Sequence, residues 1–312
     1  MTWLQLLILI GEVVLGCLRC AFILLKCLLN KLFPPEEKNL QGEVVLVTGA
    51  GQGLGRELAW RFAHEGCVVI CVDVNASTNS ATVDRLLQEG FHARGYAYDV
   101  SDRCQVQELA ERVLQDVERV DILVNNAAIL HTFNAPGKDI TQRVESFFRI
   151  NTLSHFWTTQ AFLPGMLERD HGHIVAISSM AALIGLGSAV SYSSSKSAIS
   201  GMMMSLSEEL RISGHQNIKT TCVFPYLIST PLQSCFKTFK LPPMSVEYAA
   251  EEIIQGMKHE VQWFVLPHYM GPLVNFLRML PKEMSDIFRK ILIPISSISP
   301  YELFDCATYA KK

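Results

Sequence analysis

Apolar residues dominate the first part of the chain, from residue 3 to residue 33. As one helix, residues 3–33 would be about 46 Å long, which exceeds the roughly 30 Å of hydrocarbon in a bilayer. Glu12, Arg19 and Lys26 are spaced seven residues apart and therefore share one face of that helix. The pattern predicts a membrane helix. It either spans the bilayer with this polar stripe against a partner, or lies in the interface with the stripe facing water.

A cleaved signal peptide is another interpretation of such a segment. The apolar run is too long for the core of a signal peptide, and no small-x-small cleavage site precedes Pro34. We therefore expect the segment to remain as an anchor. Arg19, Lys26 and Lys31 outnumber Glu12 in it and lie toward the rest of the chain. Since positive residues stay on the cytosolic side of a membrane, the rest of the chain is expected to face the cytosol.

Beyond Pro34–Pro35 the pattern changes to short apolar runs that alternate with helical periodicity. Short continuous apolar strands between helices are typical of a parallel sheet that is covered on both faces. The sequence therefore predicts a single-domain α/β fold with a doubly wound parallel sheet. The expected strands are 43–47, 67–72, 93–98, 122–124, 174–177, 219–224 and 262–266, and the expected helices are 54–64, 83–88, 105–117, 140–163, 195–212 and 246–259.

Composition limits the class of protein. Charged residues make up 18 % of the 312 residues and the net charge is −3, which excludes a disordered chain and gives no basic excess for nucleic acid. The nine cysteines are odd in number and scattered, so we expect a reducing compartment and no disulfide framework. No histidine has a partner at metal-ligand spacing, so no metal site is expected, and His171 and His173 are interpreted as loop residues.

A glycine-rich turn follows the first expected strand and precedes the first expected helix of this fold. It runs Thr48-Gly49-Ala50-Gly51-Gln52-Gly53-Leu54-Gly55. Glycines in this context let a dinucleotide pyrophosphate approach the backbone, where the helix N-terminus stabilises its charge. The turn predicts a dinucleotide-binding Rossmann fold, with Gly49, Gly51, Gly53, Leu54 and Gly55 at the cofactor.

The second expected strand ends at Asp73, 18 residues after Gly55. A carboxylate there accepts hydrogen bonds from a ribose 2′-hydroxyl and repels a 2′-phosphate. We therefore expect NAD as the cofactor, with NADP possible. The one N-x-S/T sequon begins at Asn75, beside this expected adenosine site, where a glycan would obstruct the cofactor. This agrees with a cytosolic catalytic part.

These features resemble the short-chain dehydrogenases/reductases over roughly residues 42–268. The turn matches the family's TGxxxGxG, and further family motifs follow in order and at family spacing. Two positions depart from the family pattern, because Ala128 ends the family's NNAG motif and Tyr226 stands where the family has glycine after proline. The matching residues are Asp99 and Val100 at the adenine, Asn126 and Ala127 within NNAG, Asn151, Ser179 at 13 residues before Tyr192, and Tyr192 with Lys196 as YxxxK.

The resemblance implies catalytic roles for Tyr192, Lys196, Ser179 and Asn151. Tyr192 and Lys196 are one helical turn apart, and the Lys196 ammonium is expected to lower the pKa of Tyr192. The phenolate would take the proton of an alcohol while hydride leaves the carbinol carbon for the nicotinamide, whose ribose Lys196 would hold. Ser179 is expected to donate to the substrate oxygen, with Ser178 as the alternative, and Asn151 to hold a water that connects Lys196 to solvent.

The segment 228–246, the substrate loop in family terms, is apolar and contains three prolines, and apolar runs continue at 270–280 and 287–298. The loop favours a lipophilic substrate. The tail is either a second membrane-contacting element or a helix folded on the body. Anchor, core and tail together resemble the membrane-associated retinol dehydrogenase and 17-beta-hydroxysteroid dehydrogenase branch of the family. This implies oxidation of a retinol-like alcohol at the endoplasmic reticulum membrane or on lipid droplets, and a possible homodimer.

Two alternatives remain open. One is a hydroxysteroid or fatty-alcohol dehydrogenase with the same site, and the other is a lipid-droplet or membrane interaction protein without useful turnover. The expected organisation is a membrane anchor (1–33), a linker (34–41), a dinucleotide-binding catalytic domain (42–268) and an apolar tail (269–312).

Overall fold

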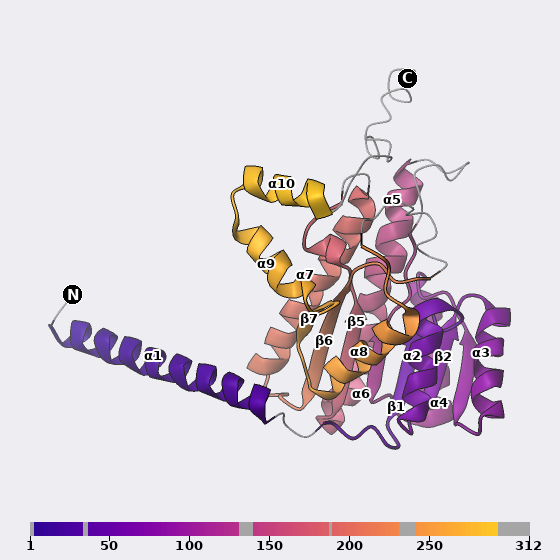
Figure 1. Ribbon diagram of the computed structural model, residues 1–312. Helices are drawn as coiled ribbons and strands as arrows, with labels where there is room; N and C mark the ends of the chain where they lie inside the picture. Colours follow the sequence, from indigo (N-terminus) through magenta and orange to yellow (C-terminus); the bar gives the residue numbers. More distant parts are fainter. Residues whose placement is uncertain (1–2, 34–36, 131–139, 187–188, 231–240, 293–312) are drawn as a thin grey trace. The chain divides into compact units, whose positions relative to one another are not determined.

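The computed structural model describes residues 3–33, 37–130, 140–186, 189–230 and 241–292 (Figure 1). These residues form two compact units, Met1–Lys38 and Asn39–Lys312. Parts of the expected linker, substrate loop and tail lie outside the described residues, namely 34–36, 231–240 and 293–312.

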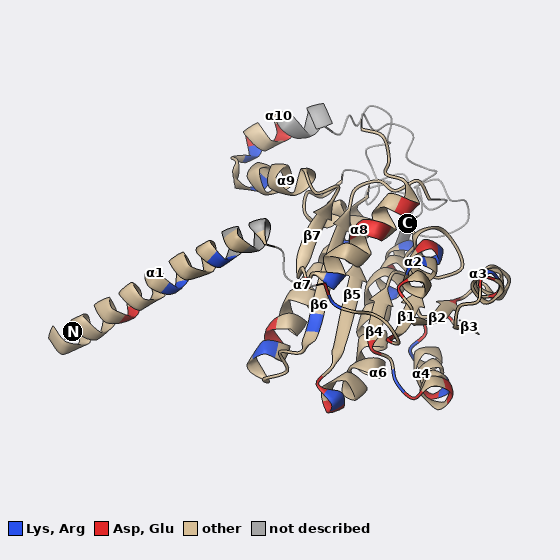
Figure 2. Ribbon diagram, turned by 60° about the horizontal axis from the view of Figure 1, so that its bottom comes forward, with Lys and Arg blue, Asp and Glu red and all other residues tan. Residues whose placement is uncertain are grey.

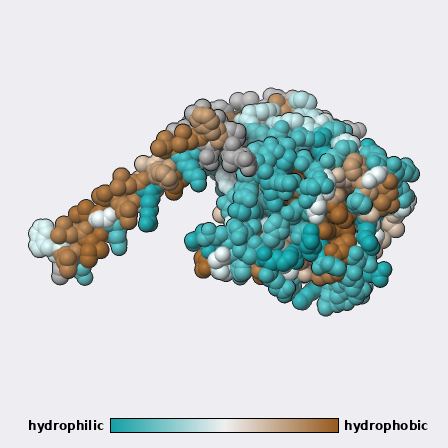
Figure 3. Space-filling model, turned by 90° about the horizontal axis from the view of Figure 1, so that it is seen from below, coloured by the Kyte–Doolittle hydropathy of each residue, from teal (hydrophilic) through white to brown (hydrophobic). Residues whose placement is uncertain are grey.

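The first unit consists of helix α1, Trp3–Leu32. Its segment Trp3–Lys26 has a mean hydropathy of 2.3 and is long enough to cross a membrane. Charged residues are few along α1 (Figure 2), and apolar side chains cover most of its surface in the view of Figure 3. A helix that is apolar around most of its circumference needs an apolar environment. The hydrocarbon of a membrane would supply it, in agreement with the expected membrane helix.

A seven-stranded parallel sheet forms the centre of the second unit (Figure 1). The strand order is β3-β2-β1-β4-β5-β6-β7, and every neighbouring pair is parallel. The central strands β1 and β4 are buried along their whole length, which explains their continuous apolar sequences. The expected doubly wound α/β fold is confirmed. The strands are β1 Val44–Thr48, β2 Val68–Asp73, β3 Ala93–Ala97, β4 Ile122–Asn125, β5 Gly172–Ile177, β6 Ile218–Pro225 and β7 Trp263–Leu266.

Helices cover both faces of the sheet. The chain moves from β1 to β3 in one direction and from β4 to β6 in the other, so right-handed connections place α2 and α3 on one face and α6 and α7 on the opposite face. Helix α8 packs against α2, and α4 packs against α6. The helices of these two layers are α2 Gly53–His64, α3 Ala76–Gln88, α4 Arg103–Val117, α6 Ser154–Arg169, α7 Val190–Ile212 and α8 Val246–Lys258.

The expected continuous helix 140–163 is wrong in one respect. The structure has helix α5, Ile140–Phe148, then a π-helical segment η1, Arg149–Leu153, and then α6. The apolar periodicity continues through the change, so the sequence does not reveal the wider turn. Single π-turns inside helices occur frequently at functional sites, and η1 contains Asn151.

Helix α3 begins earlier than the expected helix 83–88, at Ala76. The Asn75 side chain caps it by accepting hydrogen bonds from the N–H groups of Ser77 (3.1 Å) and Thr78 (3.2 Å). The added turns are rich in serine, threonine and asparagine, which favour helices weakly in their interior. The cap compensates for that weak propensity by satisfying N–H groups that lack partners within the helix.

The first part of the tail is folded on the second unit. Helix α9, Met270–Met279, packs against β7 and buries Met270, Val274 and Leu277. A further helix, α10 Lys282–Leu292, follows it. Of the two interpretations of the tail, α9 fits the helix folded on the body, although its Phe276 and Met279 side chains remain exposed.

Candidate active site

A cleft of about 290 Å³ lies at the carboxyl ends of the central strands, where the strand order reverses between β1 and β4. In open α/β sheets this is the place where ligands bind. Most of the expected cofactor and catalytic residues line it, whereas Gly51 and Asn151 are not among its lining residues. The expected residues in the lining are Gly49, Gly53, Leu54, Gly55, Asp73, Asp99, Val100, Asn126, Ala127, Ser179, Tyr192 and Lys196.

The glycine turn between β1 and α2 forms one wall of the cleft, and its shape requires glycine. Gly49 and Gly53 have φ angles of +68° and +55°, a region that residues with a Cβ atom rarely adopt. A Cβ atom on Gly55 would lie 2.1 Å from the carbonyl oxygen of Gly49. The backbone of the turn therefore packs closely on itself at the N-terminus of α2, which is where the expected pyrophosphate site requires it.

Asp73, at the end of β2, is held in place by the same turn. Its Oδ2 accepts a hydrogen bond from the N–H of Gly51 at 2.9 Å, and its Oδ1 accepts one from the N–H of Asn75 at 2.9 Å. The Arg56 guanidinium donates to the carbonyl oxygen of Gly51 on the other side of the turn. The carboxylate is thus fixed at the position where a nucleotide ribose would lie next to the expected pyrophosphate site.

Asn126 fixes the end of β4 to the end of β1. Its Nδ2 donates to the carbonyl oxygen of Thr48 at 2.9 Å, and its backbone N–H donates to Thr48 Oγ1 at 3.0 Å. The N–H of Ala127 donates to the same hydroxyl at 3.1 Å. Across the cleft, Asp99 Oδ1 accepts from the N–H of Ser101 at 2.8 Å. These hydrogen bonds hold the cofactor wall together within the protein itself.

Tyr192 and Lys196 project from the first turns of α7, and both are almost completely buried. The Ser179 side chain, just beyond the end of β5, lies near the Tyr192 phenol and favours its charged form, which lowers its pKa. Lys196 Nζ donates to the carbonyl oxygen of Ile177 at 2.7 Å. Ser178 is engaged differently, because its Oγ donates to the carbonyl oxygen of Lys196 at 2.9 Å. Of the two serines, the geometry brings Ser179 to the phenol.

Burial governs the protonation of this pair. It raises the pKa of Tyr192 above its usual value of 10.0, and the nearby Ser179 side chain opposes this rise. It lowers the pKa of Lys196 to about 7. The expectation of a lowered pKa for Tyr192 is wrong for the protein alone, because the cost of burying the phenolate exceeds the stabilisation by its neighbours.

Asn151 is fully buried in η1, next to this pair. Its Oδ1 accepts from the N–H of Ile129 at 2.8 Å, and its Nδ2 donates to the carbonyl oxygen of Ile129 at 3.1 Å and to Ser195 Oγ at 3.2 Å. Both hydrogens of the amide nitrogen are therefore used within the protein. The expected water between Asn151 and Lys196 would have to bind an oxygen atom of Asn151.

A sequence profile of the family described as short chain dehydrogenase matches residues 43–239 of this chain. The chain belongs to the short chain dehydrogenase family. As a member of this family it is an oxidoreductase that depends on a nicotinamide dinucleotide.

Individual short chain dehydrogenases are similar over most of the chain. The bovine short-chain dehydrogenase/reductase family 16C member 6 is 38 % identical over 80 % of this chain and 79 % of its own length. Human epidermal retinol dehydrogenase 2 is 37 % identical over 82 % and 85 %. Mouse estradiol 17-beta-dehydrogenase 11 is 32 % identical over 88 % and 92 %. The expected branch of the family is confirmed by these relatives.

A solved short chain dehydrogenase from Burkholderia phymatum, in complex with NAD, has the same fold. It superposes with a TM-score of 0.69, covering 84 % of this chain and 99 % of its own, at 21 % identity. At this identity the comparison supports the fold alone.

Sequence reasoning missed part of the apolar wall of this short chain dehydrogenase site. Ile129, Ile150 and Ile177 line the cleft together with Tyr226, Ile228 and the other expected residues. The available signal is position, since each of the three missed isoleucines stands within two residues of a motif residue. An apolar residue in such a place looks like part of the core until the sheet is assembled.

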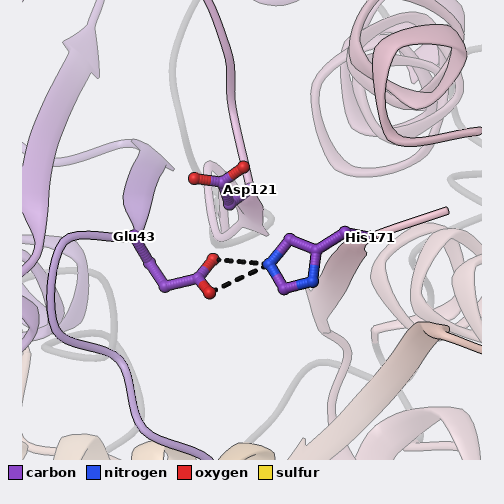
Figure 4. A group of neighbouring side chains, drawn as sticks. All are labelled: Glu43, Asp121 and His171. Atoms are coloured by element: carbon purple, nitrogen blue, oxygen red, sulfur yellow. Dashed lines mark hydrogen bonds and ion pairs between the residues drawn. The ribbon is translucent and has the colours of Figure 1, made fainter. Parts of the chain in front are cut away.

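The opposite edge of the sheet carries a second polar cluster (Figure 4). Glu43, Asp121 and His171 precede β1, β4 and β5, and possible ligand atoms of all three lie within 4.8 Å of one another. His171 Nε2 is 2.9 Å from Glu43 Oε1. However, Asp121 already pairs with Arg119 at 2.9 Å and with Arg169 at 3.3 Å. The two guanidinium groups neutralise Asp121, so the cluster is an ion-pair network at the amino ends of the strands, and no metal role is assigned to it.

Proposed function

We propose that the protein is a membrane-anchored dehydrogenase that transfers hydride from a lipophilic, retinol-like alcohol to NAD. The observation that carries the proposal is that one cleft is lined both by the glycine turn with Asp73 and by Ser179, Tyr192 and Lys196. A cofactor site and a proton-transfer group that share one cleft are what hydride transfer to a dinucleotide requires.

NAD fits the cofactor side of the cleft better than NADP. The Asp73 carboxylate is fixed by two backbone N–H groups, so it cannot turn away from a ribose without losing both hydrogen bonds. It accepts from a 2′-hydroxyl and repels a 2′-phosphate. The other residues proposed to hold the dinucleotide are Gly49, Gly51, Gly53, Leu54, Gly55, Asp99, Val100, Asn126, Ala127 and, at the nicotinamide ribose, Lys196. When bound, NAD supplies the hydride acceptor.

Tyr192 is proposed as the general base and acid. Its phenolate takes the proton of the substrate hydroxyl, and Ser179 donates a hydrogen bond to the same substrate oxygen. The raised pKa keeps the phenol protonated in the protein alone, so proton removal requires positive charge in the closed site. Lys196, one turn further along α7, provides such a charge in its protonated form. Asn151 is proposed to position Lys196 through its contact with Ser195.

The substrate side of the cleft is apolar. Ile129, Ile150 and Ile228 form its wall with Tyr226, and such a wall favours an alcohol with a large hydrocarbon body. Relatives named for retinol and estradiol support this substrate class. A hydroxysteroid or fatty alcohol is the second candidate, favoured by the Tyr226 ring, which offers a flat apolar surface and a hydroxyl group. An interaction protein without turnover is disfavoured, since Ser179, Tyr192 and Lys196 all line the cleft.

The proposed location is the endoplasmic reticulum membrane or the lipid droplet surface, with the catalytic domain in the cytosol. The length and hydropathy of Trp3–Lys26 support membrane attachment, and the positive residues toward the end of α1 support the orientation. We propose residues 1–33 as the anchor, 34–41 as linker, 42–268 as the catalytic domain and 269–312 as the tail. A homodimer is proposed by analogy with related enzymes.

The test is dinucleotide reduction by membranes that contain the protein. All-trans-retinol, estradiol and a long-chain alcohol are each offered with NAD⁺ and with NADP⁺. Tyr192→Phe is expected to lower turnover by about 100-fold or more while the dinucleotide still binds. Tyr248→Phe, a tyrosine outside the cleft, serves as the matched control and is expected to behave as wild type. Retained turnover in Tyr192→Phe contradicts the assigned base. If the wild-type protein binds NAD but turns over none of the three alcohols, the substrate class is contradicted.

A further inference from the structure

The face of α6 that packs against the sheet is polar at one end. His155, Thr158, Thr159, Phe162 and Met166 follow one another at the spacing of a single helix face, and all are buried. The first two turns of this face are polar and the later turns are apolar. A helix face over a parallel sheet is normally apolar throughout, and here the polar end is the one that continues into η1 and the active site.

Several polar atoms at this end have no protein partner. Thr158 Oγ1 donates to Asn125 Oδ1 at 2.7 Å, which brings the end of β4 against the polar face. Asn125 Nδ2, both ring nitrogens of His155 and Thr159 Oγ1 form no hydrogen bond within the described part of the chain. Each buried polar atom without a partner is costly, and four such penalties would be comparable with the whole free energy of unfolding of a typical domain. These atoms therefore need a ligand.

The donors and acceptors of the three side chains match water. Burial, together with the nearby Lys196 ammonium, keeps the pKa of His155 well below 6.5, so its ring is neutral and offers one donor and one acceptor. Asn125 offers N–H donors, and the Thr159 hydroxyl both donates and accepts. A water molecule has two hydrogens and two lone pairs, and buried waters typically bind two to four such groups. A cation would meet the Asn125 N–H donors and the positive charge of Lys196.

We propose that His155, Asn125 and Thr159 hold buried water in the interior behind the catalytic lysine, and that this water stabilises the charged form of Lys196. His155 is then a positioning residue of the active site. Among the described residues, the titratable groups near Lys196 are Tyr192 on its own helix, His155 on α6 and Cys222 on β6. Cys222 is a buried thiol whose pKa is about 12, and His155 is neutral, so neither group supplies charge at neutral pH. The Ile177 carbonyl oxygen accepts one hydrogen bond from the ammonium, at 2.7 Å, and hydration is proposed to supply the rest of its support.

The first experiment is a high-resolution crystal structure of the full chain in detergent. We expect ordered water within about 3.2 Å of a ring nitrogen of His155. The His155→Gln variant keeps polar atoms at the site and is expected to retain the water, whereas His155→Leu is expected to lose it. A wild-type structure with His155 bonded to protein atoms only, or with a dry cavity at its ring, overturns the proposal. This arm does not depend on turnover.

The second experiment is the pH profile of alcohol oxidation, and it rests on the proposed function. In His155→Leu the ammonium loses solvation, so the pH at which activity falls through deprotonation of Lys196 is expected to move down by about one unit. His155→Gln should restore the wild-type profile. If the leucine variant does not fold, Thr159→Val removes one water partner at the same site and should move the profile in the same direction. Identical profiles in all variants overturn the link to Lys196, whereas absence of turnover in the wild type contradicts the proposed function and leaves the water test intact.

Discussion

Gly55 offers a sharp test of how the cofactor turn is built. Its Cβ position lies 2.1 Å from the carbonyl oxygen of Gly49 and 2.6 Å from Asn126 Nδ2. An ordinary contact between such atoms is about 3.4 Å or longer, so in Gly55→Ala the turn has to move by about 1 Å. The obstacle is mostly backbone, which yields less than a side chain does. We therefore expect a loss of stability at the upper end of the usual overpacking range, about 3 kcal/mol.

A displaced turn also loses its fit to the pyrophosphate. NAD⁺ binding should therefore be weaker than in the wild type. The stability loss of about 3 kcal/mol corresponds to a melting temperature lower by about 6–12 °C. Thermal unfolding of the detergent-solubilised full chain, with and without NAD⁺, measures both effects. Gly201→Ala in α7 is the control, since a Cβ there meets nothing within 4 Å, and it should gain about 0.5–1 kcal/mol. Wild-type melting and NAD⁺ binding in Gly55→Ala would refute this account of the turn.

Three further outcomes are expected. Asp73→Ser removes the charge that repels a 2′-phosphate. In steady-state assays the ratio of kcat/KM with NADP⁺ to kcat/KM with NAD⁺ should therefore rise about 10- to 100-fold. An unchanged ratio would show that Asp73 does not determine the choice of cofactor. The pKa of Lys196 is lowered to about 7 in the folded protein, so between pH 7 and 9 the unfolded chain binds more protons than the folded one. The free energy of unfolding of the cofactor-free protein should therefore rise by about 1 kcal/mol per pH unit over this range. Thermal unfolding of Lys196→Met should lack this rise. Asp121→Asn weakens the buried acceptor of the Val44 N–H and should cost about 2 kcal/mol in thermal unfolding, with NAD⁺ affinity unchanged.

The parts of the site that sequence reasoning predicted are local along the chain. The glycine turn between Gly49 and Gly55 is one continuous segment, and Tyr192 and Lys196 are one turn of one helix apart. Because such groups need only secondary structure to meet, their spacing in the sequence carries the information. The order of short apolar runs and helices predicted the doubly wound sheet for the same reason.

The parts that were missed or wrong depend on distant segments. Glu43 and His171 pair across 128 residues, and nothing in either neighbourhood indicates the other. The direction of the pKa of Tyr192 depends on how completely the folded chain buries the phenol, which its four-residue spacing from Lys196 does not reveal. Ile150 lines the cleft because η1 turns it there, and the sequence reads as an ordinary helix through that point.

The π-helical segment η1 lies between α5 and α6. Phe147 of α5 packs edge-to-face on the Tyr192 ring, with 6.3 Å between ring centroids, while Thr158 of α6 bonds to Asn125 of β4. The wider turn takes up one more residue per turn than an α-helix does, so deleting one residue from 149–153 would restore a regular α-helix with nearly the same rotation between α5 and α6. Both contacts should survive that deletion, whereas a deletion elsewhere in α5 or α6 would turn one helix by about 100° and break one of them. The segment 149–153 is therefore the part of this helix pair that should tolerate the loss of one residue best, and what such a loss changes is the placement of Ile150 and Asn151 at the site.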